Sequence, residues 1–240
     1  FTLDPFFVQR DQLVDNYPDP EQYDALVLTG SAANAYDDIP WINALVAYIK
    51  RVAEQYPRVR IVGICFGHQI VARALGGACV PNAGRWEIGP TRIELTDLGK
   101  KIFGADKDDM TIQQMHRDHV PSLPPSFHLL GSTALSPVQG MVRFLPPNTT
   151  TSSTSSPPPS TTGSTTTPTP NTDPSSLLRS IQILTVQGHP EFTEPVVSAI
   201  VSQRAAAGAI DAATEGGYVQ RRWEKDDGRG RIARAVWGVV

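Results

Sequence analysis

The stretch Gly63-Ile64-Cys65-Phe66-Gly67-His68-Gln69 joins a short apolar run, residues 60–64, to a helical pattern that Gly76-Gly77 ends. Glycines two residues before and two residues after Cys65 permit a tight strand-to-helix turn that lifts the central side chain into solvent. A helix N-terminus at this point favours the thiolate form of a cysteine. The stretch therefore predicts a nucleophile elbow centred on Cys65, although a small buried cysteine between two packing glycines is the simpler interpretation.

The alternation of strand and helix continues on the N-terminal side of this stretch. Residues 25–28 form another apolar run, which ends at Thr29-Gly30-Ser31. Pro40 begins a helix that ends at Pro57 and carries its apolar residues on one face. The order strand, helix, strand, helix predicts an α/β fold in which helices cover a mostly parallel central sheet.

Further short β-like segments follow, and we expect them to complete one domain over residues 1–240. An extended segment over Phe6–Arg10 precedes the first apolar run. The later strands are expected at residues 88–95, 110–115, 127–130 and 181–186, and helices at 195–207 and 230–237.

Residues 147–176 differ in composition from the rest of the chain. Ser, Thr and Pro make up 26 of these 30 residues, and the segment has no aliphatic or aromatic side chain. Such a segment cannot bury enough apolar surface to offset the entropy of ordering it. We therefore expect a disordered insertion within the domain, since loop-closure entropy grows only slowly with length.

Composition and charge exclude several classes of protein. The 240 residues carry 21 Lys and Arg against 24 Asp and Glu, which gives no electrostatic footprint for nucleic acid or an anionic membrane. No apolar run reaches the length of about 18 residues that spans a bilayer. Two cysteines and five histidines show no paired metal-ligand spacing, so we expect neither a metal nor a disulfide framework. The start at Phe1 does not resemble a signal peptide, and a cytoplasmic location is expected.

A second motif near the C-terminus supplies the partners that a cysteine nucleophile needs. It is Val186-Gln187-Gly188-His189-Pro190-Glu191-Phe192, directly after the last apolar run. Pro190 favours an extended backbone at His189, and residues two apart in an extended chain point to the same side. His-Pro-Glu alone is most often a turn, but both motifs together predict a Cys65-His189-Glu191 triad.

These two motifs, together with Gln114-Met-His-Arg-Asp-His-Val120, resemble the class I glutamine amidotransferase family of the triad type. The resemblance covers the chain from about residue 23 onward apart from the Ser/Thr/Pro segment, and it is strongest to stand-alone fungal and plant members with GMP-synthase-amidotransferase-like sequences, similar to γ-glutamyl peptidases. It implies a flavodoxin-like three-layer sandwich. It also implies that family members begin with a strand and a helix for which this chain has no counterpart before Phe6.

The resemblance further implies the chemistry. Cys65 would attack the γ-carbonyl of glutamine or of a γ-glutamyl peptide, His189 would transfer the proton, and Glu191 would orient His189. Backbone N–H groups of Phe66 and of Gly30 or Ser31 would form the oxyanion hole. The residues implied to bind substrate are Gln69, His116 and Asp118, for which a helix-surface glutamine and a polar turn are the simpler interpretations.

The sequence thus predicts a Cys-His-Glu hydrolase that forms a γ-glutamyl thioester and needs no cofactor. If the released ammonia is used, a separate synthetase must accept it. The alternatives are a catalytically inactive regulatory or scaffold protein with the same fold, and a redox-sensing cysteine protein, which would not need the His-Pro-Glu motif.

Overall fold

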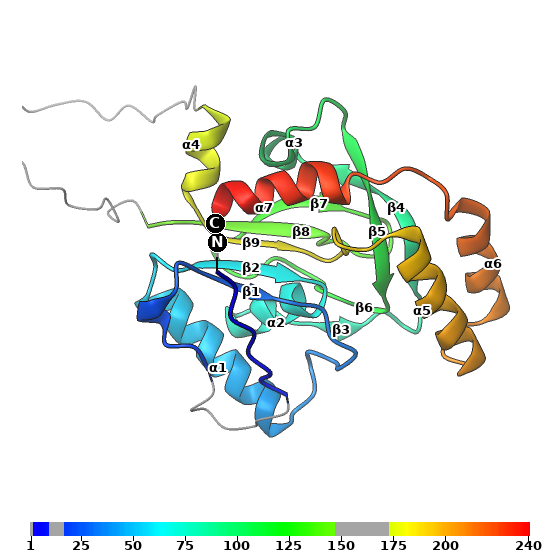
Figure 1. Ribbon diagram of the computed structural model, residues 1–240, viewed down its shortest axis with the longest axis horizontal. Helices are drawn as coiled ribbons and strands as arrows, with labels where there is room; N and C mark the ends of the chain where they lie inside the picture. The colour runs from blue at the N-terminus through cyan, green and yellow to red at the C-terminus, as the bar shows by residue number, and fades with distance from the viewer. Residues whose placement is uncertain (1, 10–16, 147–172) are drawn as a thin grey trace, which may run out of the picture.

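The computed structural model describes residues 2–9, 17–146 and 173–240 (Figure 1). In this part of the chain a seven-stranded sheet has the strand order β1-β2-β9-β8-β7-β4-β5. Its strands are β1 (Ala25–Leu28), β2 (Arg60–Ile64), β4 (Glu87–Leu95), β5 (Asp109–His116), β7 (His128–Ser132), β8 (Gly140–Phe144) and β9 (Ile181–Val186). A separate antiparallel pair joins β3 (Val80–Pro81) to β6 (Asp118–His119).

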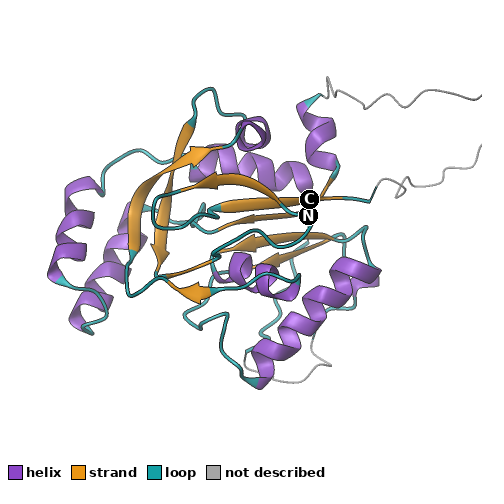
Figure 2. Ribbon diagram, turned by 180° about the vertical axis from the view of Figure 1, so that it is seen from behind, coloured by secondary structure: helices purple, strands orange, loops and turns teal. Residues whose placement is uncertain are grey.

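Helices lie on both faces of the sheet and at one end (Figures 1 and 2). One face is covered by α1 (Pro40–Gln55) and α2 (Phe66–Ala74). The other face is covered by α3 (Asp97–Phe103), α4 (Pro174–Arg179) and α7 (Ala233–Val239). Beyond β4 and β5 lie α5 (Glu194–Ala206) and α6 (Ala212–Arg221). A 3₁₀ turn (Pro20–Gln22) precedes β1, and a π-helical segment (Gly228–Ile232) leads into α7. This arrangement confirms the expected three-layer α/β fold.

The strand directions refine the expectation of a mostly parallel sheet. β1, β2 and β9 pair in parallel, while each pairing from β9 through β8, β7 and β4 to β5 is antiparallel. Because every antiparallel pairing reverses direction, β7 and β5 run the same way as the parallel trio, and only β8 and β4 run against it. Five of the seven strands thus run in one direction, but parallel pairing between neighbouring strands is limited to β1, β2 and β9, the trio that carries the two motifs.

Buried side chains explain why the strands and helices pack in this way. Every residue of β9 is buried, and β9 lies in the middle of the sheet between β2 and β8. One apolar cluster joins α1 and α2 to the sheet and a second joins α3 and α7 to its other face. A third, smaller cluster, which includes Tyr218 and Val197, holds α5 and α6 against β4 and β5. These clusters fix the positions from which the functional side chains project.

Several sequence expectations need correction. Residues 2–9 contain no strand, so the described part of the segment Phe6–Arg10 is irregular; Phe6 packs edge-on against Tyr23. α2 begins at Phe66, directly after Cys65, which is where the sequence places the helix N-terminus. α4 begins at Pro174 with Asp173 as its N-cap, so the last residues of the predicted disordered insertion are helical. The remainder of that insertion, residues 147–172, lies outside the described residues.

No helix in the described residues combines the length and the apolar character that crossing a membrane requires.

Candidate active site

Cys65 occupies a strained backbone position between β2 and α2. Its φ is 54° and its ψ is −104°, a conformation that costs energy for a residue with a Cβ and that persists only where the surroundings enforce it. The Cys65 N–H donates a hydrogen bond to the Val186 carbonyl at 3.0 Å, and the Cys65 carbonyl accepts one from the Gln69 N–H at 3.1 Å. These bonds tie the turn to the end of β9 and to the first turn of α2.

The two glycines that flank Cys65 allow the turn to close. A Cβ at Gly63 would lie 2.7 Å from the carbonyl oxygen of Gly67, and a Cβ at Gly67 would lie 2.1 Å from the carbonyl oxygen of Leu28. Both contacts are with backbone atoms, which cannot rotate away. The strand-to-helix turn expected from the sequence is therefore present, and its spacing of glycines has a steric cause. The turn does not lift Cys65 into solvent as expected, because Cys65 is buried, with 6% of the residue exposed.

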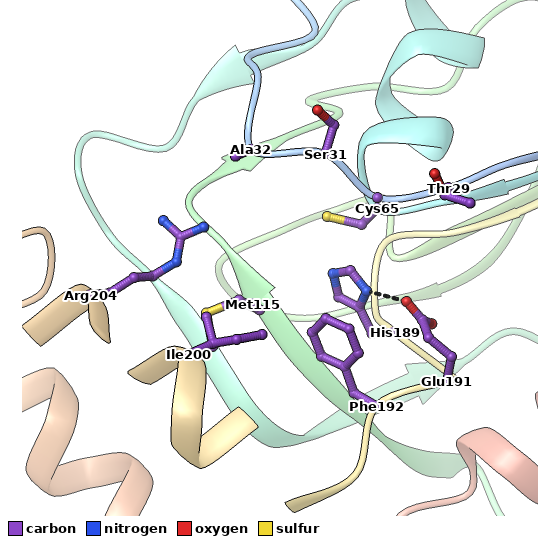
Figure 3. Close-up of a pocket in the computed structure, with 11 residues that line it drawn as sticks. Thr29, Ser31, Ala32, Cys65, Met115, His189, Glu191, Phe192, Ile200 and Arg204 are labelled. Atoms are coloured by element: carbon purple, nitrogen blue, oxygen red, sulfur yellow. Dashed lines mark hydrogen bonds and ion pairs between the residues drawn. The ribbon is translucent and has the colours of Figure 1, made fainter. Parts of the chain in front are cut away.

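His189 and Glu191 follow β9, next to this turn. The His189 N–H donates to the Gln113 carbonyl at 2.8 Å, which anchors the segment to β5. His189 Nδ1 lies 2.7 Å from Glu191 Oε1 (Figure 3). The imidazole is buried, with 7% of its side chain exposed, whereas the Glu191 side chain is 48% exposed. The carboxylate thus holds one ring nitrogen and leaves the other to face Cys65 (Figure 3).

Packing and charge fix both the orientation and the protonation of His189. The ring of Phe192 stacks on the imidazole, with centroids 3.9 Å apart and planes inclined by 8°. Burial alone would lower the pKa of His189, but hydrogen bonds with Cys65 and Glu191 outweigh it and raise the pKa to about 9. At neutral pH His189 is therefore protonated and can supply a proton to a group bound beside Cys65.

A pocket of about 290 Å³ opens over these side chains (Figure 3). It is lined by Thr29, Gly30, Ser31, Ala32, Cys65, Met115, His189, Glu191, Phe192, Ile200 and Arg204. The structure therefore brings together five of the residues singled out from the sequence: Cys65, His189, Glu191, Gly30 and Ser31. Phe66 packs its ring on Trp41, and its backbone begins α2 immediately after Cys65.

Gly30 lies in contact with both halves of the site. A Cβ at Gly30 would lie 2.8 Å from His189 Cε1 and 3.7 Å from Cys65 Cβ. The backbone of the loop after β1 therefore lies so close to the His189 imidazole that only glycine fits at position 30. This contact leaves no room for a methyl group.

Replacing Gly30 with alanine is expected to displace His189 and, for the γ-glutamyl substrates that the sequence resemblance implies, to lower kcat/KM by about 10²-fold, as misplacement of a catalytic group by about 1 Å does. Since the clash involves a side chain at the pocket surface, the melting temperature should change little. Steady-state kinetics and thermal unfolding measure the two effects. Gly216→Ala is the control, because a Cβ there meets nothing within 4 Å. Activity of Gly30→Ala equal to that of Gly216→Ala would contradict the assigned packing.

Gln69, His116 and Asp118 are buried and do not line the pocket. Gln69 Nε2 donates to the Asp118 carbonyl at 2.9 Å and to Gln187 Oε1 at 3.1 Å. His116 Nδ1 lies 3.0 Å from the same carbonyl, and His116 Nε2 lies 3.1 Å from Glu87 Oε2. Burial raises the pKa of Asp118. The geometry differs from the expected direct contact with substrate, because Gln69 and His116 contact the backbone carbonyl of Asp118 and other buried side chains and do not line the pocket.

Six further pocket residues were not identified as site residues from the sequence: Thr29, Ala32, Met115, Phe192, Ile200 and Arg204. Phe192 directly follows the His-Pro-Glu motif, so its position was open to inference. Ile200 and Arg204 lie four residues apart on α5, a spacing that places both on one helix face. Nothing in the sequence indicates which face meets the site. No cluster of three or more His, Cys, Asp or Glu side chains that could hold a metal occurs in the described residues.

Comparisons with known proteins agree with the fold. The class I glutamine amidotransferase family model matches residues 5–143. A glutamine amidotransferase-like protein of Schizosaccharomyces pombe is 36% identical over 190 residues, which are 78% of this chain and 61% of that protein. γ-Glutamyl peptidase 4 of Arabidopsis thaliana is 32% identical over 129 residues, 50% of this chain and 49% of that protein. This chain thus spans less than two thirds of either curated relative.

A solved structure shows the same fold at low sequence identity. The glutamine amidotransferase from Methylobacillus flagellatus superimposes with a TM-score of 0.61 at 18% identity, covering 92% of this chain and 76% of the other. The family match extends over more than half of the chain and includes the elbow. On this basis the chain belongs to the class I glutamine amidotransferase family.

Proposed function

We propose that this protein is a cysteine hydrolase of the glutamine amidotransferase type, which cleaves the γ-amide of glutamine or of a γ-glutamyl peptide. The observation that carries the proposal is the meeting, in one pocket, of Cys65 on a strained turn with a buried imidazole that Glu191 holds at 2.7 Å. A nucleophile, a base and an orienting carboxylate are the groups that covalent catalysis of acyl transfer requires.

The first half of the proposed reaction forms a thioester. Cys65 Sγ attacks the γ-carbonyl carbon, and the carbonyl oxygen takes up negative charge. The Phe66 N–H and an N–H of Gly30 or Ser31 would stabilise that charge, and one such donor is typically worth about 10²–10³ in kcat. His189 then gives its proton to the leaving nitrogen, the C–N bond breaks, and ammonia or an amine departs. Glu191 holds the imidazolium in position throughout.

The second half releases the acyl group. Neutral His189 takes a proton from water, and the resulting hydroxide attacks the thioester carbon. The C–S bond breaks with its electron pair on Cys65 Sγ, glutamate leaves, and His189 keeps the proton that it took from water, so that the site is ready for another cycle. The proposed cycle consumes the substrate and one water molecule, and no step in it requires an oxidant, a metal or a cofactor.

The substrate distinguishes two versions of this function. Glutamine as substrate releases ammonia, which a separate synthetase would have to accept, whereas a γ-glutamyl peptide releases an amino acid or peptide and needs no partner. The similarity to a protein named γ-glutamyl peptidase supports the second version. Purified protein should be assayed for ammonia released from glutamine and for glycine released from γ-glutamylglycine. Release of neither product would favour the inactive regulatory alternative.

The pH dependence of the reaction should reflect the raised pKa of His189. The imidazolium persists up to its folded-state pKa of about 9, so kcat/KM is expected to hold at neutral pH and to fall as pH rises through that value. Removing the charge of Glu191 takes away one of the causes that raise this pKa. Glu191→Gln should therefore shift the falling limb to lower pH by about one unit.

Profiles of kcat/KM between about pH 6 and pH 10 for the two proteins measure this shift. Glu224→Gln is the control, because Glu224 is an exposed carboxylate outside the pocket. Superimposable alkaline limbs for the unmodified protein and Glu191→Gln would contradict the assigned role of Glu191.

A further inference from the structure

Arg204 places a cation in the same pocket, and the proposed reaction does not use it. Of the described residues that line the pocket, Arg204 is the sole Lys or Arg. It projects from the last turn of α5, four residues after Ile200. In Figure 3 the guanidinium of Arg204 and the carboxylate of Glu191 lie on opposite sides of Cys65. The two ends of the pocket thus differ in charge.

An aromatic ring holds Arg204 in place. The Arg204 guanidinium carbon lies 5.0 Å from the centre of the Trp86 ring, within the range of a cation–π contact. Trp86 in turn donates from Nε1 to the Ala209 carbonyl at 3.2 Å, which fixes the ring against the end of α5. The stacked guanidinium keeps its N–H donors at its edge, because the contact with the ring uses only its face.

Arg204 differs in its partners from two other arginines of the C-terminal part of the chain. Arg222 lies 3.7 Å from Glu194, and Arg231 lies 3.4 Å from Asp227, so both meet a carboxylate of the protein. Across the part of the chain that the structure describes, no hydrogen bond or ion pair engages the Arg204 guanidinium. A partly buried guanidinium that is positioned by stacking and lacks a protein anion is well suited to a ligand anion.

We propose that Arg204 binds a carboxylate of the substrate and makes the pocket specific for γ-glutamyl compounds, an inference that rests on the proposed function. Both substrate classes fit this chemistry. Glutamine and γ-glutamyl peptides carry an α-carboxylate on the glutamyl group, and peptides carry a second carboxylate at their C-terminus. The planar fork of Arg binds either group through two parallel N–H···O bonds, which a Lys cannot form.

Kinetics of Arg204→Gln with three substrates test this role. Loss of the bidentate contact is expected to raise KM for γ-glutamylglycine by about 10- to 100-fold with little change in kcat, because the contact is remote from the reacting carbon. Arg204→Lys should recover only part of the loss. Arg117→Gln is the matched control, since Arg117 also lies over the Trp86 ring, at 5.8 Å, but does not line the pocket.

The choice of substrates identifies the carboxylate. A rise in KM for γ-glutamylglycine but not for γ-glutamylglycinamide or glutamine assigns the C-terminal carboxylate. An equal rise for all three assigns the α-carboxylate. Unchanged KM values for all three, or the same change in Arg117→Gln, would overturn the proposal.

A binding measurement separates this proposal from the proposed function. Calorimetric titration of γ-glutamylglycine into the Cys65→Ala protein needs no turnover, and adding Arg204→Gln should weaken binding by about 10-fold or more. Arg204-dependent binding to Cys65→Ala, together with an unmodified protein that hydrolyses neither glutamine nor γ-glutamylglycine, would uphold the role of Arg204 and refute the catalytic proposal. Absent binding, or binding that Arg204→Gln leaves unchanged, would refute the role of Arg204.

Discussion

Cys65→Ala is expected to abolish hydrolysis of glutamine and of γ-glutamyl peptides, lowering kcat by about 10⁴-fold or more, as removal of the nucleophile does in other triad enzymes. In the proposed mechanism Cys65 alone forms the acyl intermediate, and His189 and Glu191 transfer or orient the proton. Steady-state release of ammonia or amine from the purified variant measures the effect. The fold should persist, because alanine keeps the backbone and the Cβ of residue 65 and removes only the sulfur.

The other cysteine provides the matched control for this prediction. Cys79 is buried in the core cluster that α1 and α2 form with the sheet, and burial raises the pKa of its thiol. Cys79→Ala should therefore retain kcat and lose only a little stability. Equal loss of activity in both variants would indicate a structural effect, and retained activity in Cys65→Ala would contradict the proposed mechanism.

Gly67→Ala is expected to have the largest effect on stability. The added Cβ would lie 2.1 Å from the Leu28 carbonyl oxygen and 2.9 Å from Leu28 Cβ, so α2 would have to move away from β1. Forced separation of packed elements belongs to the most destabilising class of substitution, about 4 kcal/mol or more. Denaturant unfolding followed by circular dichroism measures the loss, and most of the variant is expected in inclusion bodies.

A second helical glycine isolates the steric cause. Gly216 lies in α6, where an added Cβ would meet no atom within 4 Å, so Gly216→Ala gains helix propensity without a clash. Its free energy of unfolding should rise by a few tenths of a kcal/mol up to about 1 kcal/mol. If Gly67→Ala were as stable as Gly216→Ala, the close approach of α2 to β1 would be wrong.

The features that were predictable from the sequence depend on local rules. The two glycines that flank Cys65 indicate positions where an added Cβ would clash with backbone atoms. The apolar run before each motif indicates a buried strand. His189 and Glu191 meet at 2.7 Å as expected, but through a turn in which the Phe192 N–H donates to the His189 carbonyl at 3.3 Å, and not through the extended chain that Pro190 predicted. Each of these inferences needed no more than a few neighbouring residues.

The features that were not predictable depend on contacts between distant segments. Trp86 and Arg204 are 118 residues apart, and only the packing of α5 and α6 on β4 and β5 brings them together. The burial of Gln69 against Asp118 and Gln187 likewise results from the meeting of three segments. Apolar patterning also does not reveal pairing direction, which is why the antiparallel half of the sheet was not foreseen.

Mass spectrometry of the intact chain after treatment with an electrophilic glutamine analogue tests the central claim most directly. The account predicts one adduct per chain, on the peptide that contains Cys65, formed more slowly when γ-glutamylglycine is present and much more slowly in His189→Ala. Circular dichroism on the same sample establishes that the protein is folded. Absence of an adduct from folded protein, or equal labelling of Cys65 and Cys79, would contradict the assignment of Cys65 as the nucleophile.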